Sequence, residues 1–241
     1  MLRFLRLTLV LAFPFIAAWL LYFLFDHGYL RLNYPSKEEF PMWGLDVSHH
    51  QGIIDWPAVA EQGFRFAMIK ATEGGDFKDP RFKENWANAR AAGLAVGGYH
   101  FYTFCRPVED QAANLLLTVP IETSSFPPTL DLEFGGNCSK RPTRAQFFSD
   151  LQVITKKIVS AYGSAPILYV TREFFDEYIA GSDLEAPIWI RDVFFRPRLD
   201  MARPWIFWQF ANRGRVRGIE VPVELNVFNG NETALRATIR N

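Results

Sequence analysis

Two carboxylates stand at the end of an apolar stretch in the middle of the chain. The run Thr129-Leu130-Asp131-Leu132-Glu133 carries Asp131 and Glu133 two residues apart. Residues with this spacing face the same side of a β-strand, so we expect the two carboxylates to point together while the leucines fill the other face. Like charges held this close raise the pKa of one carboxyl, which can then act as a protonated general acid beside an ionised neighbour. Hydrolysis of a glycosidic bond needs such a pair.

The same tripeptide also occurs where a strand runs into a solvated loop and each carboxylate simply faces water. The tripeptide alone therefore does not decide between catalysis and an ordinary strand end. The residues at the other strand ends have to decide it.

Composition limits the class of substrate. The chain has 241 residues, 49% hydrophobic and 16% aromatic, and its 26 basic residues balance its 26 acidic ones. This length suits one domain with one sizeable core. Zero net charge gives no electrostatic reason to expect a nucleic-acid partner, whereas 7 Trp and 8 Tyr could stack on the rings of a sugar. No C-x-x-C motif or His cluster suggests a metal, and we expect no cofactor.

The amino terminus reads as a separate unit. Residues 7–25 are apolar apart from Thr8, and Arg3 and Arg6 precede them. A stretch of this length can cross a bilayer, and the positive charge ahead of it predicts a cytoplasmic amino terminus with the rest of the chain outside. The alternative is a cleaved signal peptide, against which the stretch is long and lacks a small-x-small site. We expect a transmembrane anchor at 1–27, a linker at 28–41 and a catalytic domain at 42–241.

The chain has two cysteines, Cys105 and Cys138, and each follows a candidate strand. Outside the membrane they could form a disulfide. They could equally remain free thiols, because spacing alone does not show that the two loops meet.

Short apolar runs alternate with amphipathic segments from residue 43 onward, which is typical of β/α units. The candidate strands lie at 43–47, 66–71, 95–101, 129–133, 167–170, 187–191, 205–210 and 224–227. Helical patterns lie at 56–62, 80–92, 108–119, 143–162, 171–180 and 231–239. The segments 192–204 and 211–223 read as loops. We therefore predict an α/β fold, an irregular (β/α)8 TIM-like barrel with some helices reduced or missing, preceded by one transmembrane helix.

Chemistry in such barrels takes place at the carboxyl ends of the strands. Polar and aromatic residues recur there, namely Asp46, Ser48, His49, His50, Lys70, Glu73, Tyr99, Tyr102, Asp131, Glu133, Tyr169, Trp189, Arg191, Trp208, Gln209 and Glu224. One charged strand end is ordinary, but this many predict one shared cleft. His100 faces away from Tyr99 and is expected to be a hydrogen-bonded core histidine.

Several segments together resemble the family-25 glycoside hydrolases, lysozymes that cleave the β-1,4 bond after N-acetylmuramic acid in peptidoglycan. The resemblance spans residues 42–230 and rests on Gly44-Leu45-Asp46-Val47-Ser48 with Gln51-Gly52, Ile69-Lys70-Ala71-Thr72-Glu73-Gly74, Gly98-Tyr99-His100-Phe101, Leu130-Asp131-Leu132-Glu133, Trp208-Gln209-Phe210 and Glu224-Leu225-Asn226-Val227-Phe228. In this order and with these gaps the motifs are highly specific.

The resemblance implies roles for individual residues. Glu133 matches the family's catalytic acid, Asp131 its partner carboxylate and Asp46 another acid of the same cleft. Tyr99, Glu73 and Trp208 would lie near the sugar, and the strand-end residues Tyr102, Tyr169, Trp189 and Gln209 are further candidates for substrate binding. Glu224 is the fourth candidate catalytic acid, and it departs from the pattern, because the family usually has Asp there.

The expected reaction is proton donation by Glu133 to the leaving oxygen, followed by proton uptake from water. Asp131 could attack the anomeric carbon, stabilise the transition state or position the substrate's N-acetyl group. Two other functions stay open: a non-catalytic, membrane-tethered peptidoglycan-binding protein, and a chitinase-like glycosidase, although no D-x-x-D-x-D-x-E run is present. We expect a monomer in the bacterial cell envelope, anchored in the inner membrane with its catalytic domain outside the cytoplasm, or else secreted after signal cleavage.

Overall fold

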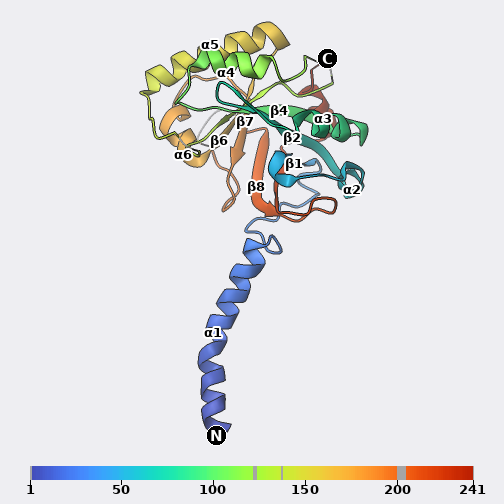
Figure 1. Ribbon diagram of the computed structural model, residues 1–241, viewed down its shortest axis with the longest axis vertical. Coiled ribbons are helices and arrows are strands. Elements are labelled where there is room, and N and C mark those ends of the chain that lie inside the picture. Colours follow the sequence, from blue (N-terminus) through green and yellow to red (C-terminus); the bar gives the residue numbers. More distant parts are fainter. Residues whose placement is uncertain (1, 122–123, 137, 200–204, 241) are drawn as a thin grey trace.

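A closed β-barrel forms the centre of the molecule (Figure 1). The computed structural model describes residues 2–121, 124–136, 138–199 and 205–240, with side chains from residue 12 onward. Among these described residues, nine strands form one sheet, and it closes because β1 pairs with β2 as well as with β9. The short β3 pairs only with β2, which leaves eight strands in the barrel. The strands are β1 Trp43–Val47, β2 Phe64–Glu73, β3 Phe77–Lys78, β4 Ala95–Phe101, β5 Thr129–Leu132, β6 Ile167–Thr171, β7 Ile188–Arg191, β8 Phe207–Gly214 and β9 Val223–Phe228.

The last barrel strand runs against the others. Neighbouring barrel strands from β1 through β8 are parallel, whereas β9 is antiparallel to both β8 and β1 and the short β3, outside the barrel, is antiparallel to β2. The connection from β8 to β9 is a short loop at 215–222 with no helix, and a parallel pair would need a longer crossover. The expected (β/α)8 barrel is therefore wrong at this point: the barrel is mixed, and part of the predicted loop at 211–223 is strand.

Helices cover the outside of the barrel. They are α2 Trp56–Glu61, α3 Phe82–Ala91, α4 Val108–Leu116, α5 Arg144–Tyr162, α6 Arg172–Phe174 continued by the π-helical turn η2 Phe175–Ile179, and α7 Glu232–Ala237, with a 3-10 turn η1 at His49–Gln51. The longest, α5, begins where the Thr143 side chain accepts a hydrogen bond from the backbone N–H of Gln146, and it ends at Gly163 in the left-handed conformation.

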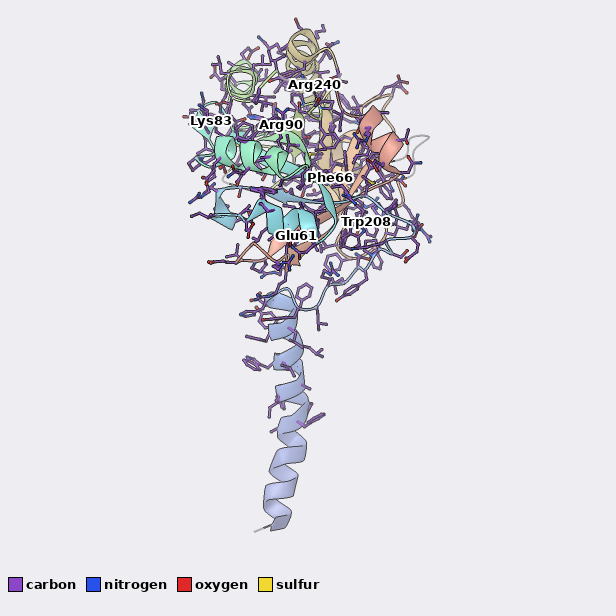
Figure 2. The ribbon with its side chains drawn as sticks, turned by 90° about the vertical axis from the view of Figure 1, so that its right-hand side faces the viewer. Glu61, Phe66, Lys83, Arg90, Trp208 and Arg240 are labelled. Atoms are coloured by element: carbon purple, nitrogen blue, oxygen red, sulfur yellow. A yellow bond between two sulfur atoms is a disulfide. The ribbon has the colours of Figure 1, made fainter. Side chains whose placement is uncertain are left out.

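Alternation along the strands separates two apolar layers. The barrel interior below the polar rim is filled by Phe66, Met68, Phe207 and neighbouring side chains. Leu130, Leu132 and Trp208 point outward into the larger layer between barrel and helices. In Figure 2, Phe66 lies near the centre of the domain and Trp208 nearer its edge. The rim of the interior, at the carboxyl ends of the parallel strands, is left for polar side chains.

The chain begins with helix α1, Leu2–Asp26, which extends away from the barrel (Figure 1). Crossing a bilayer takes about 20 consecutive apolar residues. Within the part of the chain that the structure describes, no helix is both long enough and apolar enough to do so. The predicted transmembrane helix is corrected accordingly.

The two cysteines form a disulfide that joins the loops after β4 and β5. The Cα atoms of Cys105 and Cys138 lie 5.7 Å apart, although 33 positions separate them in the sequence. Of the two alternatives, the disulfide is therefore correct and two free thiols are not. The bond links the loop that directly follows Glu133 to the loop after β4.

Candidate active site

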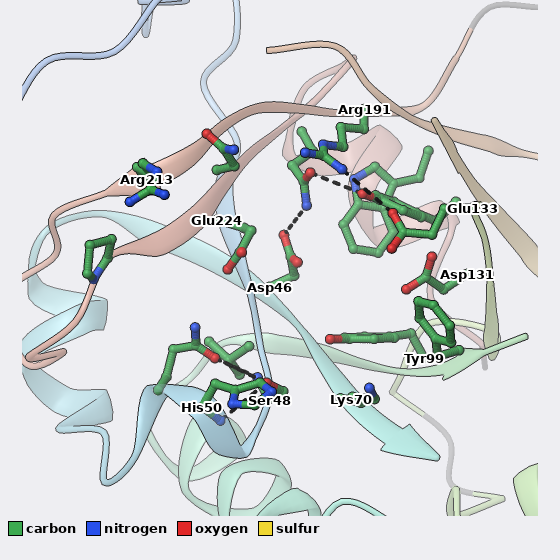
Figure 3. A pocket seen from close by; sticks show the side chains of 18 residues that line it. Asp46, Ser48, His50, Lys70, Tyr99, Asp131, Glu133, Arg191, Arg213 and Glu224 are labelled. Carbon is green, nitrogen blue, oxygen red and sulfur yellow. Dashed lines mark hydrogen bonds and ion pairs between the residues drawn. The ribbon is translucent and has the colours of Figure 1, made fainter. Parts of the chain in front are cut away.

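A cleft of about 550 Å³ opens at the rim of the barrel (Figure 3). It collects side chains from strands that lie far apart in the sequence, because the carboxyl ends of parallel strands meet at one edge. The start of β9 joins them, since an antiparallel strand brings its amino end to the same rim. The side chains that line the cleft include Asp46, His50, Lys70, Tyr99, Asp131, Glu133, Tyr169, Trp189, Arg191, Gln209, Asn212, Arg213, Pro222 and Glu224.

Asp131 and Glu133 open onto this cleft together, as the strand spacing predicts (Figure 3). Leu130 and Leu132 pack on the opposite face of β5. Asp131 is buried, and no hydrogen-bond donor of the described residues reaches its Oδ1 atom. Glu133 is more accessible and faces the Arg191 guanidinium at 3.7 Å. The pair thus presents one deep carboxyl and one shallow carboxyl to a ligand.

Electrostatics keep protons on this pair. Burial raises the pKa of Asp131 well above its ordinary value, and the charge of Glu133 raises it further. Burial also raises the pKa of Glu133, while Arg191 and Lys70 oppose the rise. Protonating one carboxyl removes the repulsion felt by the other, so the two groups titrate as a unit. Such a pair can retain a proton at pH values where isolated carboxyls are ionised.

A hydrogen-bond network fixes Asp46 across the cleft. Its Oδ2 atom accepts from Gln209 Nε2 at 2.9 Å and from Asn226 Nδ2 at 2.7 Å. Gln209 in turn accepts from the Tyr169 hydroxyl at 3.1 Å, and Asn226 accepts from Trp189 Nε1 at 2.8 Å. Burial raises the pKa of Asp46 to about 6, and the two amide donors oppose that rise. Both donors use one oxygen, so the orientation of the carboxyl is set.

Glu224 lies beside Asp46 on the neighbouring strand, as the β1–β9 register pairs the two residues. Burial, together with the Asp46 charge, raises the pKa of Glu224 to about 8. At neutral pH the Glu224 carboxyl is therefore protonated and can donate a hydrogen bond.

The aromatic candidates divide into two groups. Tyr99, Tyr169 and Trp189 line the cleft. The rings of Tyr169 and Trp189 pack edge to face, with their centroids 4.6 Å apart. Trp208 does not line it, because its side chain points outward, donates Nε1–H to the Asp192 carbonyl at 2.8 Å and packs against Phe40. The prediction that Trp208 lies near the sugar is not met by its placement.

Two further candidates also lie away from the cleft. Tyr102 is buried in the outer apolar layer, with its ring against Phe104. Glu73 lines a neighbouring recess of about 590 Å³ and forms an ion pair with Lys70 at 2.6 Å. Lys70 borders both hollows, so Glu73 touches the cleft only through this partner.

His100 is a core residue, as expected. Its ring is fully buried, shares a hydrogen bond of 2.8 Å with the Thr72 hydroxyl and contacts the Gln111 side chain at 3.4 Å. Burial lowers the pKa of His100 to about 4, which keeps the ring neutral.

The sequence did not suggest functions for two residues of the site. Arg191 was one of many polar strand ends, and its contact with Glu133 spans strands β7 and β5. Asn226 is completely buried within a hydrophobic strand, where an unpaired amide would be costly. A polar side chain inside β9 was the signal that could have revealed Asn226. For metals, the described residues contain no group of three or more His, Cys, Asp or Glu side chains placed to hold an ion.

Comparisons with known proteins agree with this geometry. Residues 45–219 match the family model described as glycosyl hydrolases family 25. The chain is 37% identical over 205 residues to the protein YegX of Escherichia coli K12, which covers 83% of this chain and 74% of that protein. It is 32% identical over 213 residues to Lysozyme M1 of Streptomyces globisporus, covering 82% and 71% of the two chains.

Among solved structures, a family 25 glycosyl hydrolase from Bacillus anthracis superposes with a TM-score of 0.81 at 37% identity, covering 87% of this chain and 98% of the other. The matched region contains the three cleft acids Asp46, Asp131 and Glu133, whereas Glu224 lies beyond its end. The chain therefore belongs to family 25 of the glycosyl hydrolases, and it is a glycosidase.

Proposed function

We propose that this protein is a muramidase that hydrolyses the β-1,4 bond between N-acetylmuramic acid and N-acetylglucosamine in peptidoglycan. The observation that carries the proposal is the pairing of Asp131 and Glu133 at one end of a cleft lined by polar and aromatic side chains. Similarity to Lysozyme M1 supports the choice of substrate. We assign the activity to the barrel, residues 42–241.

Glu133 is the proposed general acid and base. It is the more accessible member of the pair, so it can reach the leaving oxygen, and burial raises its pKa as it does that of Asp131, with which it shares a proton. Its proton passes to the glycosidic oxygen as the bond to the anomeric carbon breaks. A water molecule then adds to that carbon and returns a proton to Glu133.

Asp131 is the proposed partner carboxylate. Its unpartnered Oδ1 atom can accept the N–H of a substrate N-acetyl group or face the anomeric carbon. Once Glu133 carries the shared proton, Asp131 is left as the negative charge that stabilises the positively charged transition state. The anomeric configuration of the first product, followed by NMR, separates direct attack and N-acetyl participation, which retain configuration, from attack by water, which inverts it.

Asp46, Tyr99, Tyr169, Trp189 and Gln209 are the proposed substrate-binding and orienting groups. Asp46 is held by two amides, and the aromatic rings offer flat faces to sugar rings. The wall polymer lies outside the cytoplasm, and the Cys105–Cys138 disulfide suits an oxidising compartment. We therefore place the reaction outside the cytoplasm.

The test is digestion of purified peptidoglycan, with the new reducing ends identified by mass spectrometry. The parent should release muramic-acid reducing ends, and Glu133→Gln should lower kcat by at least about a thousandfold while the protein stays folded. Glu84→Gln is the matched control, because it removes an exposed carboxyl that pairs with Arg81 and does not line the cleft. Equal rates for parent and Glu133→Gln would refute the role of Glu133. Cleavage of chitin in preference to peptidoglycan would refute the substrate.

A further inference from the structure

One wall of the cleft rests on the chain segment that precedes the barrel. The wall is the β8–β9 hairpin, which contributes Asn212, Arg213 and Pro222 to the cleft lining. In Figure 3, Glu224 lies between Arg213 and the Asp131–Glu133 pair. Arg213 therefore marks the end of the cleft away from the proposed proton donor.

The end of helix α1 contacts Arg213 on the side away from the cleft. The Nη1 atom of Arg213 donates to the Asp26 carbonyl at 2.7 Å and forms an ion pair with Asp26 Oδ1 at 3.0 Å. Asp26 does not line the cleft, so it contacts Arg213 from outside. Among the described residues, no partner reaches Nε or Nη2 of Arg213. One edge of the guanidinium is thus fixed and its other donors remain available.

The backbone of the same segment is built for close contact with the hairpin. Gly28 has a φ of +74°, and a Cβ atom at this position would lie 2.6 Å from the Arg213 carbonyl oxygen. Arg215 Nε donates to the His27 carbonyl at 2.7 Å. These contacts, 187 and 188 positions apart in the sequence, hold the outer side of the hairpin against residues 26–28.

The charges around the cleft make Arg213 different from the other cations that line it. Lys70 is engaged by Glu73 at 2.6 Å, and Arg191 faces the carboxylate of Glu133. Glu133 lines the cleft itself and Glu73 lines the adjoining recess, whereas Asp26, the acidic partner of Arg213, lines neither hollow. A guanidinium with a fixed edge and free donors is suited to a carboxylate, because it loses little side-chain entropy on binding.

We propose that Arg213 binds a carboxylate of the peptidoglycan strand and that Asp26 is a positioning residue for it. The inference rests on the proposed function, since it names a group of the same substrate. Peptidoglycan offers two sources of this chemistry: the carboxylates of the stem peptide, and the lactyl carboxylate of muramic acid where the peptide has been removed.

The test is steady-state kinetics of the full chain on soluble peptidoglycan fragments. Arg213→Ala should raise KM about tenfold with kcat within twofold of the parent, the loss expected for one charge-assisted hydrogen bond. Arg213→Lys should recover part of the loss, because it keeps the charge but not the planar fork. Asp26→Asn should raise KM by a smaller factor, and the double variant should match Arg213→Ala alone.

The control is Glu61→Gln, which removes the partner of Arg217 in the loop of the same hairpin, an exposed ion pair of 2.7 Å. It should leave KM unchanged. A KM in Arg213→Ala that is unchanged on both peptide-bearing and peptide-stripped strands would overturn the inference. So would an Asp26→Asn effect that persists in the Arg213→Ala background, since Asp26 would then act through the fold and not through Arg213.

Two modified substrates distinguish the sources. If Arg213 binds the stem peptide, the KM difference between parent and Arg213→Ala should vanish on strands stripped of peptide by an amidase. If it binds the lactyl carboxylate, which an amide bond masks in peptide-bearing muramic acid, the difference should be larger on stripped strands than on peptide-bearing ones and vanish once the freed carboxylates are converted to amides. A difference that survives both treatments contradicts the inference. A parent that releases no muramic-acid ends refutes the proposed function instead, so the two failures are separable.

Discussion

Asp46 and Glu224 lie directly opposite each other on the antiparallel strands β1 and β9, so two carboxyls share one side of the cleft. Repulsion across this pair contributes to the pKa of about 8 for Glu224. Asp46 stays closer to its ordinary pKa because two amides donate to it. The side of the cleft facing Asp131 thus holds one oriented carboxyl and one protonated carboxyl.

Replacing Glu224 should increase stability near neutral pH. The carboxyl has a pKa of about 8 in the folded protein and 4.5 as its reference value, so between these values the folded state holds a proton that the unfolded state has lost. The free energy of unfolding therefore falls as pH rises through this window, by at most about 1.4 kcal/mol per pH unit. Glu224→Gln removes this loss. Its stability advantage over the parent should grow from pH 5 to pH 8 and then level off, as measured by urea unfolding.

The same variant tests what Glu224 does in the cleft. A protonated carboxyl and an amide are both neutral hydrogen-bond donors, so Glu224→Gln should keep kcat/KM at pH 6 within about fivefold of the parent. A loss of a hundredfold or more would mean that the negative charge of Glu224 is needed. Equal pH dependence of unfolding in the two proteins would contradict the raised pKa.

Removing Asn226 should shift the pH profile through Asp46. Asn226→Ala deletes one of the two donors that oppose the rise in the pKa of Asp46, so that pKa should move above about 6. If ionised Asp46 orients the substrate, the acidic limb of kcat/KM should move to higher pH, with a loss of about tenfold at pH 5.5. Asn229→Ala is the matched control, because Asn229 donates to the Trp205 carbonyl and does not line the cleft. An unmoved acidic limb in Asn226→Ala would exclude Asp46 from that role.

Local sequence pattern predicted the positions of the strands and the side to which Asp131 and Glu133 point. Both follow from the two-residue period of a strand, which placed Leu130 and Leu132 in the outer layer. The direction of β9 was not predictable in this way, because a short strand has the same pattern in either direction. It depends on the hairpin that joins β9 to β8.

The sequence pattern also does not show which of two consecutive residues at a strand end faces the cleft. Trp208 and Gln209 were both assigned to the substrate, yet consecutive residues point to opposite faces, and only Gln209 reaches the cleft. Aromatic residues suit either face, so their type does not settle the choice. The contact between Asp26 and Arg213 was equally hidden, since 187 positions separate the two residues.

The two tryptophans should therefore respond differently to the same substitution. Trp208→Phe removes a hydrogen bond and part of a packed side chain in the outer layer, which should cost about 1–3 kcal/mol of unfolding free energy and leave kcat/KM close to that of the parent. Trp189→Phe removes the donor to Asn226, whose amide holds Asp46, so kcat/KM should fall about tenfold. Denaturant unfolding and peptidoglycan kinetics measure the two effects. A larger loss of activity in Trp208→Phe than in Trp189→Phe would contradict the placement of both rings.

Gly135 should control the position of the proposed proton donor. A Cβ atom at this residue would lie 2.7 Å from Glu133 Oε1, the end of a flexible side chain, so Gly135→Ala should displace that carboxyl and leave the barrel intact. A misplacement of about 1 Å at a reacting group can cost a hundredfold in rate, and we expect kcat to fall between about tenfold and a hundredfold. Gly93→Ala is the control, since a Cβ there meets no atom within 4 Å, although its φ of +86° adds backbone strain. If Gly135→Ala keeps the parent kcat, the position of Glu133 does not depend on the space that Gly135 leaves free. That conclusion holds even if Gly93→Ala destabilises the fold.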